Sequence, residues 1–217
     1  DVETVTAESY GPSSSAGAID ADDFHYSNTS CSYNSGTGAY SCVFDDVQIY
    51  AEPGSWTCLV NVTDYALNSN DTETDTASIN SLLAIDVAEA DSFLDFGSVG
   101  VGQQSAEQTT NFENEGNVEI DVEVDTYRDG QDTDDTSGMS CGTGTIPATN
   151  ISASETSGSG HAAMNAAGLL TIQANEAEAT GEDQVPTTGA IYWLLDVPAS
   201  GVAGTCDGTV FFGATTT

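Results

Sequence analysis

Residues 115–125, EGNVEIDVEVD, decide the fold class of this chain. From Val118 to Asp125, apolar and acidic residues alternate without a break. A period of two indicates a β-strand with one buried face, because successive side chains point to opposite sides of a strand. The stretch therefore predicts an inner face of Val118, Ile120, Val122 and Val124 and an outer face of Glu119, Asp121, Glu123 and Asp125.

The outer face of this strand is a row of four carboxylates that repel one another. Same-face side chains lie ~6.7 Å apart on a strand, and two like charges about 7 Å apart repel by roughly 0.6 kcal/mol in water. The chain of 217 residues has 35 acidic residues and a single arginine, which gives a formal net charge of −34. At molar salt the screening length falls to about 3 Å. We therefore expect a halophilic or divalent-rich extracellular setting.

The charge balance argues against several functions. Nucleic-acid binding needs a basic surface, and a chain whose one basic side chain apart from histidine is Arg128 cannot build one. The same shortage argues against binding anionic membranes and against clamping phosphates. No apolar run approaches the ~20 residues of a membrane span. We expect no nucleic-acid partner and no membrane insertion, and a start without methionine suggests a processed, secreted chain.

Short alternating runs separated by Ser, Thr, Gly and Asn recur along the whole chain, which is typical of β-sandwiches. We predict an all-β fold of two tandem β-sandwich modules, Ig-like or jelly-roll-like, over residues 1–84 and 85–217. The expected strands cover residues 40–50, 56–64, a Thr-rich run ending near Ile79, 93–99, 105–112, 118–125, 169–174, 191–197 and 205–212. Residues 129–140 and 152–160 are expected to form exposed polar loops.

The first ten residues, DVETVTAESY, are extended in character and weakly apolar, with Val2, Val5 and Ala7 set between polar residues. Two interpretations stay open. The segment is either the first strand of its own module or an arm that completes the sheet of a neighbouring copy by strand addition. In the second case the arm is the contact that joins one copy to the next.

Three stretches resemble modules of secreted proteins. Residues 51–64, AEPGSWTCLVNVTD, are similar to the corner and following strand of Ig-like and PKD-like domains. Residues 94–103 and 111–124, with the patterns FG-x-V-x-x-G and N-x-G-N, resemble a β-sandwich module of archaeal surface proteins, and residues 191–214 resemble its closing hairpin. This module is similar to the subunits of archaeal bundling pili and TasA-type fibres, in which an N-terminal strand inserts into the next subunit.

The five cysteines lack metal-site spacing, so disulfides are the default in a secreted protein. Cys141 and Cys206 lie in the second module, and closing so long a loop is worth about 4 kcal/mol in the entropy model. We expect these two to pair. Cys31 and Cys42 flank SYNSGTGAYS, which can place them opposite each other in a hairpin, whereas the Ig-like resemblance implies a partner for Cys58 on the facing sheet. We favour Cys31–Cys42 and leave Cys58 unassigned.

No set of residues in the sequence brings a nucleophile, a base and an orienting group together, so we assign no catalytic residue and expect no enzyme. The G-x-S-x-G pattern at residues 138–142 lacks the strand-to-helix context of a nucleophile elbow. Tyr192-Trp193 and Phe211-Phe212 could stack on sugar rings, but such aromatic residues are more often sandwich core.

Two kinds of ligand remain candidates, and no resident cofactor is certain. Calcium is bound by flexible acidic loops, and one loop offers Asp129, Asp132, Asp134 and Asp135. N-linked glycans attach at N-x-S/T sequons in secreted proteins, and the four sequons begin at Asn28, Asn61, Asn70 and Asn150.

Together, these features predict a secreted or cell-surface structural protein. We expect a subunit of an extracellular archaeal filament or surface assembly whose partner is a copy of itself. Strand addition suits such a chain because main-chain hydrogen bonds carry it and acidic side chains can still face solvent. The alternatives are a cell-surface adhesin or carbohydrate-binding module, which predicts exposed aromatic residues, and an S-layer component.

Overall fold

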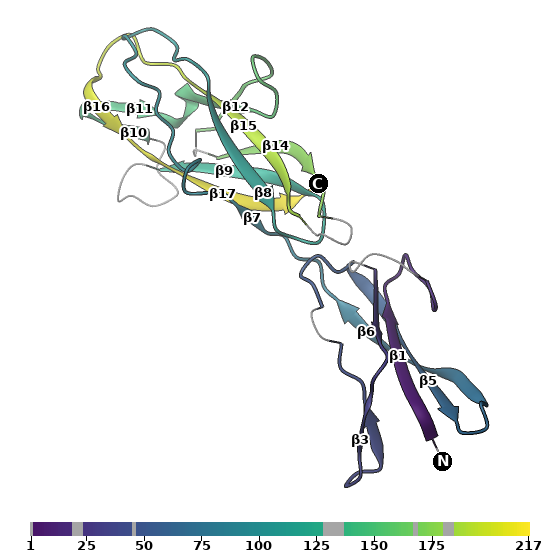
Figure 1. Cartoon of the computed structure of the whole chain (residues 1–217). Helices are drawn as coiled ribbons and strands as arrows, with labels where there is room; N and C mark the ends of the chain where they lie inside the picture. The colour runs from purple at the N-terminus through teal and green to yellow at the C-terminus, as the bar shows by residue number, and fades with distance from the viewer. Residues whose placement is uncertain (1, 19–23, 45–46, 128–136, 167–168, 180–184) are drawn as a thin grey trace. The chain divides into compact units, whose positions relative to one another are not determined.

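The structure is a computed structural model, and it describes residues 2–18, 24–44, 47–127, 137–166, 169–179 and 185–217 (Figure 1). Within these ranges the chain forms antiparallel β-strands and one short 3-10 turn, η1 (Ala148–Asn150). This confirms the all-β fold class. Among the described residues there is no helix with the length and apolarity needed to cross a membrane.

The chain divides into two compact units. The first unit contains Asp1–Leu82, Gly116–Val118 and Glu178–Val185, and the second contains Leu83–Glu115, Glu119–Ala177 and Pro186–Thr217. The sequence boundary expected between residues 84 and 85 lies close to the junction at Leu82. The sequence division did not include the two short later segments that belong to the first unit.

The first unit has one four-stranded sheet in the order β2-β1-β5-β6 and a separate two-stranded hairpin, β3-β4. Its strands are β1 (Val2–Tyr10), β2 (His25–Asn28), β3 (Ser32–Asn34), β4 (Ala39–Ser41), β5 (Gly54–Asp64) and β6 (Ser69–Ile79). β1 pairs with β2 on one side and with β5 along almost its whole length on the other. Val5 and Ala7 are buried on its inner face. The first ten residues thus form a strand of their own sheet, the first of the two interpretations.

The core of the first unit is small. Tyr26, Ala51 and Trp56 form it, and Phe44 and Ile79 pack against it. The rings of Tyr26 and Trp56 stack 5.5 Å apart, and the indole donates a hydrogen bond to the carbonyl of Glu52. The strand expected over residues 40–50 is wrong: β4 ends at Ser41, and the described residues beyond it form no strand. The Cys31–Cys42 disulfide closes the β3-β4 hairpin at that point.

The second unit contains three sheets around one core. Their orders are β13-β12-β15-β8-β7, β14-β9-β17 and β11-β10-β16. The strands are β7 (Ile85–Asp86), β8 (Gln108–Asn114), β9 (Ile120–Tyr127), β10 (Ser137–Thr143), β11 (Thr145–Pro147), β12 (Ile151–Ser154), β13 (Ala162–Ala163), β14 (Leu169–Glu176), β15 (Thr187–Leu195), β16 (Ala203–Asp207) and β17 (Thr209–Thr216). The core includes Phe112, Ile151, Met164, Ile191 and Trp193.

The alternating stretch quoted above becomes β9, the middle strand of the sheet β14-β9-β17. Ile120, Val122 and Val124 are fully buried, and Glu123 is exposed, as the period of two predicts. Asp121 departs from the expected bare acidic face, because it is only 5% exposed and accepts a hydrogen bond from the Asn175 amide at 3.0 Å.

The residues opposite the outer acids of β9 are uncharged. Glu123 lies between Thr171 of β14 and Gly213 of β17, and Asp125 lies between Leu169 and Phe211. Like charges directly across a sheet destabilise it. Repulsion on this face is therefore confined to neighbours along β9 itself.

Two further strand predictions need correction. Residues 93–99 form no strand, because Asp95 accepts the Gly97 amide in a tight turn and Gly97 has a positive φ of 65°. The strand expected over residues 205–212 is two strands, β16 and β17, separated at Gly208. A Cβ at Gly208 would lie 2.4 Å from the Gly138 carbonyl oxygen, so the backbone passes too close for a side chain.

The expected polar loops are shorter than predicted. Ser137 already begins β10, and β12 occupies residues Ile151–Ser154. Both strands carry small side chains that resemble a loop in composition. The backbone pairing of each strand with its neighbour, rather than apolar patterning, makes it regular.

The structure contains both expected disulfides. Cys141 and Cys206 are directly opposite in the β10-β16 pair, with Cα atoms 3.9 Å apart. Cys31 and Cys42 close the base of the β3-β4 hairpin. Cys58 is a free thiol in β5, half-buried and 3.6 Å from the Ser9 hydroxyl.

Deleting residues 1–10 should unfold the first unit and leave the second folded. β1 is an inner strand, so its loss leaves β2 without a partner and opens the β5 backbone to solvent. Hydrogen exchange should show β5 and β6 losing protection while β9 and β15 keep theirs. A matched deletion of residues 1–3, in which Val2 and Glu3 are exposed, stops short of Val5 and should leave both units protected. Persistent protection of β5 in the longer deletion would contradict the assignment of β1.

Candidate interaction site: two free sheet edges and a groove

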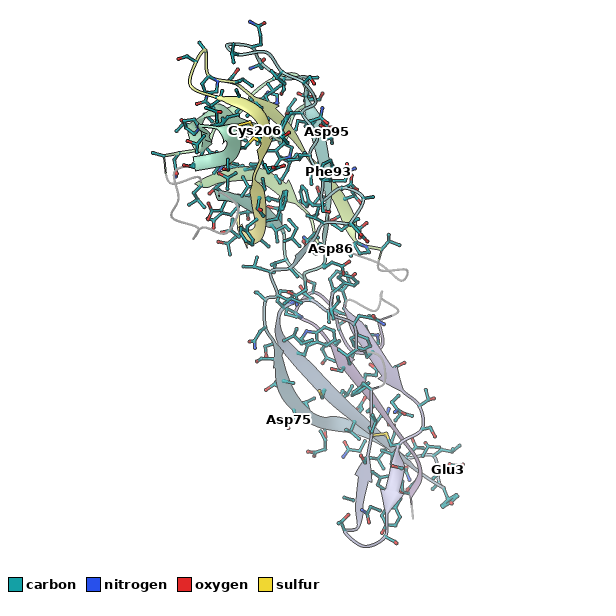
Figure 2. The ribbon with its side chains drawn as sticks, turned by 90° about the vertical axis from the view of Figure 1, so that its left-hand side faces the viewer. Glu3, Asp75, Asp86, Phe93, Asp95 and Cys206 are labelled. Carbon is teal, nitrogen blue, oxygen red and sulfur yellow. A yellow bond between two sulfur atoms is a disulfide. The ribbon has the colours of Figure 1, made fainter. Side chains whose placement is uncertain are left out.

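β6 is an edge strand at the end of the first unit's sheet. Every residue from position 69 to 78 is exposed, and only Ile79 is half-buried. Such a long exposed edge is a template for pairing with another chain, and proteins commonly protect edges of this kind with charged side chains. β6 carries three acids, Asp71, Glu73 and Asp75 (Asp75 in Figure 2).

The two faces of β6 differ in chemistry. Glu73 and Asp75 pair with Val60 and Cys58, and Thr74 and Thr76 pair with the alternate residues of β5. The acids therefore lie on one face of the strand and the threonines on the other. A register shift between Val60 and Val62 places one extra residue in β6 near its start.

β17 is an edge strand of the second unit, paired with β9 along its whole length. Its sequence, TVFFGATT, contains no charged residue. β17 is the C-terminal strand of the sequence and follows β16 directly after Gly208. The edge strands β6 and β17 thus differ in character: β6 carries acids, and β17 carries no charged residue.

A groove of about 860 Å³ borders β17. Its walls include Val210 and Phe212 of β17, Trp193 of β15 and the segment 93–99, with Phe93 78% exposed at its mouth (Phe93 and Asp95 in Figure 2). The Trp193 and Phe212 rings meet edge-to-face at 6.0 Å in the groove. Segment 93–99, which turns at Gly97 and forms no strand, supplies one wall of this groove.

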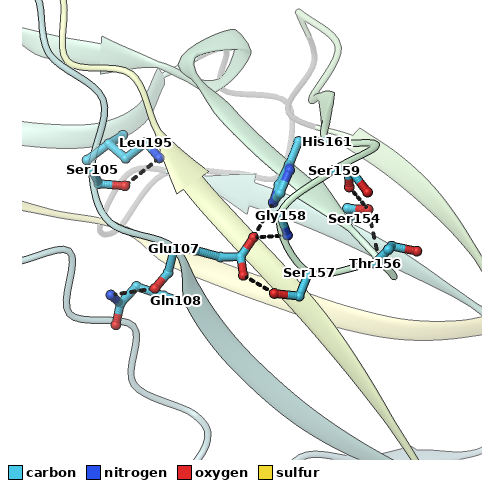
Figure 3. A network of polar contacts seen from close by, with 10 residues as sticks. All are labelled: Ser105, Glu107, Gln108, Ser154, Thr156, Ser157, Gly158, Ser159, His161 and Leu195. Carbon is cyan, nitrogen blue, oxygen red and sulfur yellow. Dashed lines mark hydrogen bonds and ion pairs between the residues drawn. The ribbon is translucent and has the colours of Figure 1, made fainter.

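A separate polar network lies on the second unit around Glu107 (Figure 3). Its Oε1 accepts the Ser157 hydroxyl at 2.6 Å, and its Oε2 accepts the Gly158 amide at 2.8 Å. The Nε2 atom of the largely buried His161 lies 3.2 Å from Oε2, close enough for an ion pair, although not in hydrogen-bonding geometry. The hydrogen bond from Ser157, then that from Gly158, and the charge of His161 hold the pKa of Glu107 below its ordinary value of 4.5.

The hydrogen bonds of this network hold the loop that follows β12 in place. Ser154, at the end of β12, accepts the Thr156 amide and donates to the Ser159 carbonyl. A serine nucleophile needs a base that takes its proton, whereas here serine and histidine contact different oxygens of one carboxylate whose pKa is lowered. The arrangement holds the loop in place and offers no nucleophile–base pair.

The structure places the other candidate residues as follows. Asp129, Asp132, Asp134 and Asp135 lie outside the described residues, so the calcium proposal stays a prediction. In the part that the structure describes, no group of three or more His, Cys, Asp or Glu could hold a metal. Residues 138–142 lie in β10 with Cys141 disulfide-bonded, and β11 rather than a helix follows.

Of the four aromatic residues considered as sugar ligands, Trp193 and Phe212 pack in the core, whereas Tyr192 is half-buried and Phe211 is 45% exposed. Trp193 is fully buried and donates to the Thr110 hydroxyl at 3.1 Å. The exposed aromatic pair is instead Tyr33 and Tyr40 in the β3-β4 hairpin. Sequence reasoning missed this pair, although its signal was present: two tyrosines placed symmetrically between Cys31 and Cys42.

No family model matches the chain, and no curated protein matches it. A solved structure titled BspA_C_WT aligns with 99% of this chain and 85% of its own chain, at 11% sequence identity and a TM-score of 0.25. A TM-score this low carries no argument about fold or function. The proposals below therefore depend on the geometry of this chain and on the resemblance of its sequence motifs.

Glu107 should stabilise the second unit at neutral pH and lose this effect in acid. Its folded-state pKa is lowered, so the stabilisation is complete above the unfolded value of 4.5 and disappears as the pH falls through the lower folded value. Glu107→Gln should reduce the melting temperature of the second unit at pH 7, and the difference from wild type should shrink as the pH falls below 4.5 and through the lowered folded pKa. Glu119→Gln, at an exposed position, is the matched control. A difference that is constant with pH would contradict this role.

Proposed function

We propose that this chain is a structural subunit of an extracellular assembly in a saline medium, in which the β6 edge of one copy pairs with the β17 edge of the next. The observation that carries the proposal is that two strands at the ends of described sheets differ in character: β6 has three acids, and β17 has no charged residue. Two disulfides support an oxidising, extracellular setting.

Charge repulsion favours pairing of β6 with β17 over pairing of two β6 strands. Two β6 strands side by side would set Asp71, Glu73 and Asp75 of one copy against the same acids of the other, and like charges across a ladder are destabilising. Beside β17 these acids face only Thr, Val, Phe, Gly and Ala. A contact between two different surfaces is head-to-tail, and it produces an open filament when its rotation does not close a ring.

The faces of β6 suit this position. A strand added to β17 extends the sheet β14-β9-β17 and borders the groove. The Thr74 and Thr76 face can turn its methyl groups towards the groove while Glu73 and Asp75 remain in solvent. Main-chain hydrogen bonds supply the affinity in this mode of recognition.

Salt controls such an assembly. Each copy has a formal net charge of −34, so approaching copies repel at low ionic strength. At molar salt the screening length of about 3 Å is shorter than the separation of neighbouring strands, about 4.8 Å. The resemblance to archaeal surface modules in residues 94–124 supports the same conclusion. The acids of β6 thus prevent edge pairing at low salt concentration and permit it at molar salt.

Neutralising the β6 acids should lower the salt concentration at which the chain assembles. The variant combines Asp71→Asn, Glu73→Gln and Asp75→Asn, and light scattering with electron microscopy would follow assembly from ~0.1 M to about 4 M NaCl. A control with the same net charge replaces Glu113, Glu119 and Glu155, which are exposed and lie outside β6, β17 and the strand β9 beside it. Its midpoint should shift less. A wild-type chain that stays monomeric throughout would overturn the proposal.

Proline substitutions test which backbone edge is used. Successive N–H groups of β17 point to opposite sides, so one of Gly213→Pro and Ala214→Pro removes only an outward donor. That variant should stay folded and lose assembly, since proline cannot donate to a ladder. Unchanged assembly in whichever variant keeps the β9 ladder protected would exclude the β17 edge.

A second candidate function, neutral carbohydrate binding, is favoured by the exposed tyrosines of the β3-β4 hairpin. Tyr33 is 58% exposed and Tyr40 40% exposed, with ring centroids 5.0 Å apart. The disulfide closes the base of the hairpin, and the Asn34 carbonyl and side chain bind the amides of the turn. Residues 24–44 contain no charged side chain apart from a histidine, so the hairpin can approach an uncharged polymer without desolvating carboxylates.

Tyr33→Ala and Tyr40→Ala should each weaken binding to a neutral polysaccharide roughly tenfold if this surface stacks on sugar rings. Affinity electrophoresis in gels containing the polysaccharide would measure the change. Tyr65→Ala is the matched control, because Tyr65 is 71% exposed and lies outside the hairpin. Equal retardation of all four proteins would exclude the hairpin as a sugar site.

A further inference from the structure

The four sequons differ in whether the amide nitrogen that would carry a glycan is accessible. An N-linked glycan forms one bond to Asn Nδ2 and leaves that atom a single N–H, so the nitrogen must be accessible and have room for a sugar beside it. The hydroxyl at the second following residue is also required. The structure allows each sequon to be judged on both points.

Two sequons use their amide nitrogen to hold the fold. Asn28 lies half-buried in β2, donates from Nδ2 to the Val43 carbonyl and accepts the Ser30 amide at 2.7 Å. Asn150, at the end of η1, donates from Nδ2 to the Asp196 carbonyl at 2.6 Å. Both side chains are half-buried and hold Nδ2 against a carbonyl, so a sugar bonded to either nitrogen would have to fit beside the strand or turn that it contacts.

Asn61 is enclosed for a different reason. It lies in the middle of β5, an inner strand, and is half-buried. Its Oδ1 atom is buried, and its side chain borders a small cavity of about 230 Å³ together with Thr6, Glu8 and Gly17. A sugar at this position would have to displace the segment around Gly17, whose amide is bound by Glu8 at 2.7 Å.

Asn70 meets both requirements. It is exposed near the start of β6, where the strand carries its extra residue. Its Oδ1 accepts the Thr72 amide at 3.1 Å and the Thr72 hydroxyl at 2.8 Å, and among the described residues its Nδ2 donates to no group. The side-chain oxygen is therefore fixed by the sequon's own threonine, and the exposed side chain leaves Nδ2 available for a new bond.

We infer that Asn70 is the one sequon of this chain that carries an N-linked glycan. The co-reactant is an activated sugar whose anomeric carbon bears a phosphate or pyrophosphate leaving group. The bond between Nδ2 and the anomeric carbon forms, the bond from that carbon to the phosphate oxygen breaks, and Nδ2 loses one proton.

This site is compatible with pairing at the β6 edge but does not depend on it. Asn70 pairs with Val62, and alternation along β5 puts it on the same face as Glu73 and Asp75. A glycan there lies on the acidic face and leaves the Thr74 and Thr76 face clear. Glycosylation at Asn70 depends on the surroundings of the four sequons and not on contacts between copies, so it stands or fails independently of the assembly.

The test is intact-mass analysis and glycopeptide mapping of the full chain secreted from a host that performs N-glycosylation. Wild type should carry one glycan, and Asn70→Gln should remove its whole mass. Asn28→Gln, Asn61→Gln and Asn150→Gln should keep it wherever the variant is secreted. Thr72→Ser retains the hydroxyl and should stay glycosylated, whereas Thr72→Ala should not.

Circular dichroism of Asn70→Gln and Thr72→Ala separates loss of modification from loss of folding. A folded variant without the glycan supports the inference. An unmodified wild-type chain from this host, a glycan mapped to any other sequon, or an unchanged mass in Asn70→Gln would each overturn it. None of these outcomes tests the proposed salt-dependent assembly. That proposal is tested by light scattering and electron microscopy of variants in β6 and β17, not by the mass of a glycan.

Discussion

A chain with 35 acidic residues and one arginine must hold its carboxylates with N–H and O–H groups rather than with ion pairs, and the loops of this protein are fixed in that way. Asp121 accepts the Asn175 amide, and Glu107 accepts the Gly158 amide and the Ser157 hydroxyl. In the first unit, Asp64 binds the amides of residues 66 and 68, and the side-chain hydrogen bond from Asn68 lowers its pKa. Hydrogen bonds to a charged acceptor are stronger than neutral ones, so these contacts can replace salt bridges.

The same shortage of cations constrains how copies can meet. Electrostatic complementarity between acidic and basic patches is excluded, because no copy can supply a basic patch. What remains is the backbone, which carries no net charge and pairs wherever a strand edge is free. In the proposed assembly β6 and β17 are the edge strands that meet, and the acids on β6 disfavour its pairing with a second β6. Screening by salt then changes the balance without any change in the contacts themselves.

The pattern of residues along the sequence correctly predicted features that are determined within one short segment. The alternation in residues 118–125 located β9 to within two residues, and the hairpin between Cys31 and Cys42 gave the right disulfide. Burial of Asp121 could not be predicted, because it depends on a register shift in β14 that brings the Asn175 amide to its carboxylate. Residues 93–99 were predicted to form a strand because apolar residues recur in this segment. The turn at Gly97 depends on its positive φ and on the hydrogen bond to Asp95, which the apolar pattern does not reveal. The positions of the edge strands and of the groove depend on the order of strands in each sheet. That order is set by tertiary pairing and cannot be inferred from local sequence.

The disulfide of the second unit gives the neutral edge a further property. Cys206 lies in β16, and only Asp207 and Gly208 separate it from β17, so the covalent bond to Cys141 anchors the start of that edge strand. Closing a loop of 65 residues contributes about 4 kcal/mol in the entropy model. A strand that is already ordered loses less conformational freedom when another strand binds beside it, which favours association. β6 lies instead at the edge of a unit with a small core and is exposed along nearly its whole length. In a pairing of the two, β17 is therefore the rigid template, and β6 is the strand whose residual freedom is lost on binding.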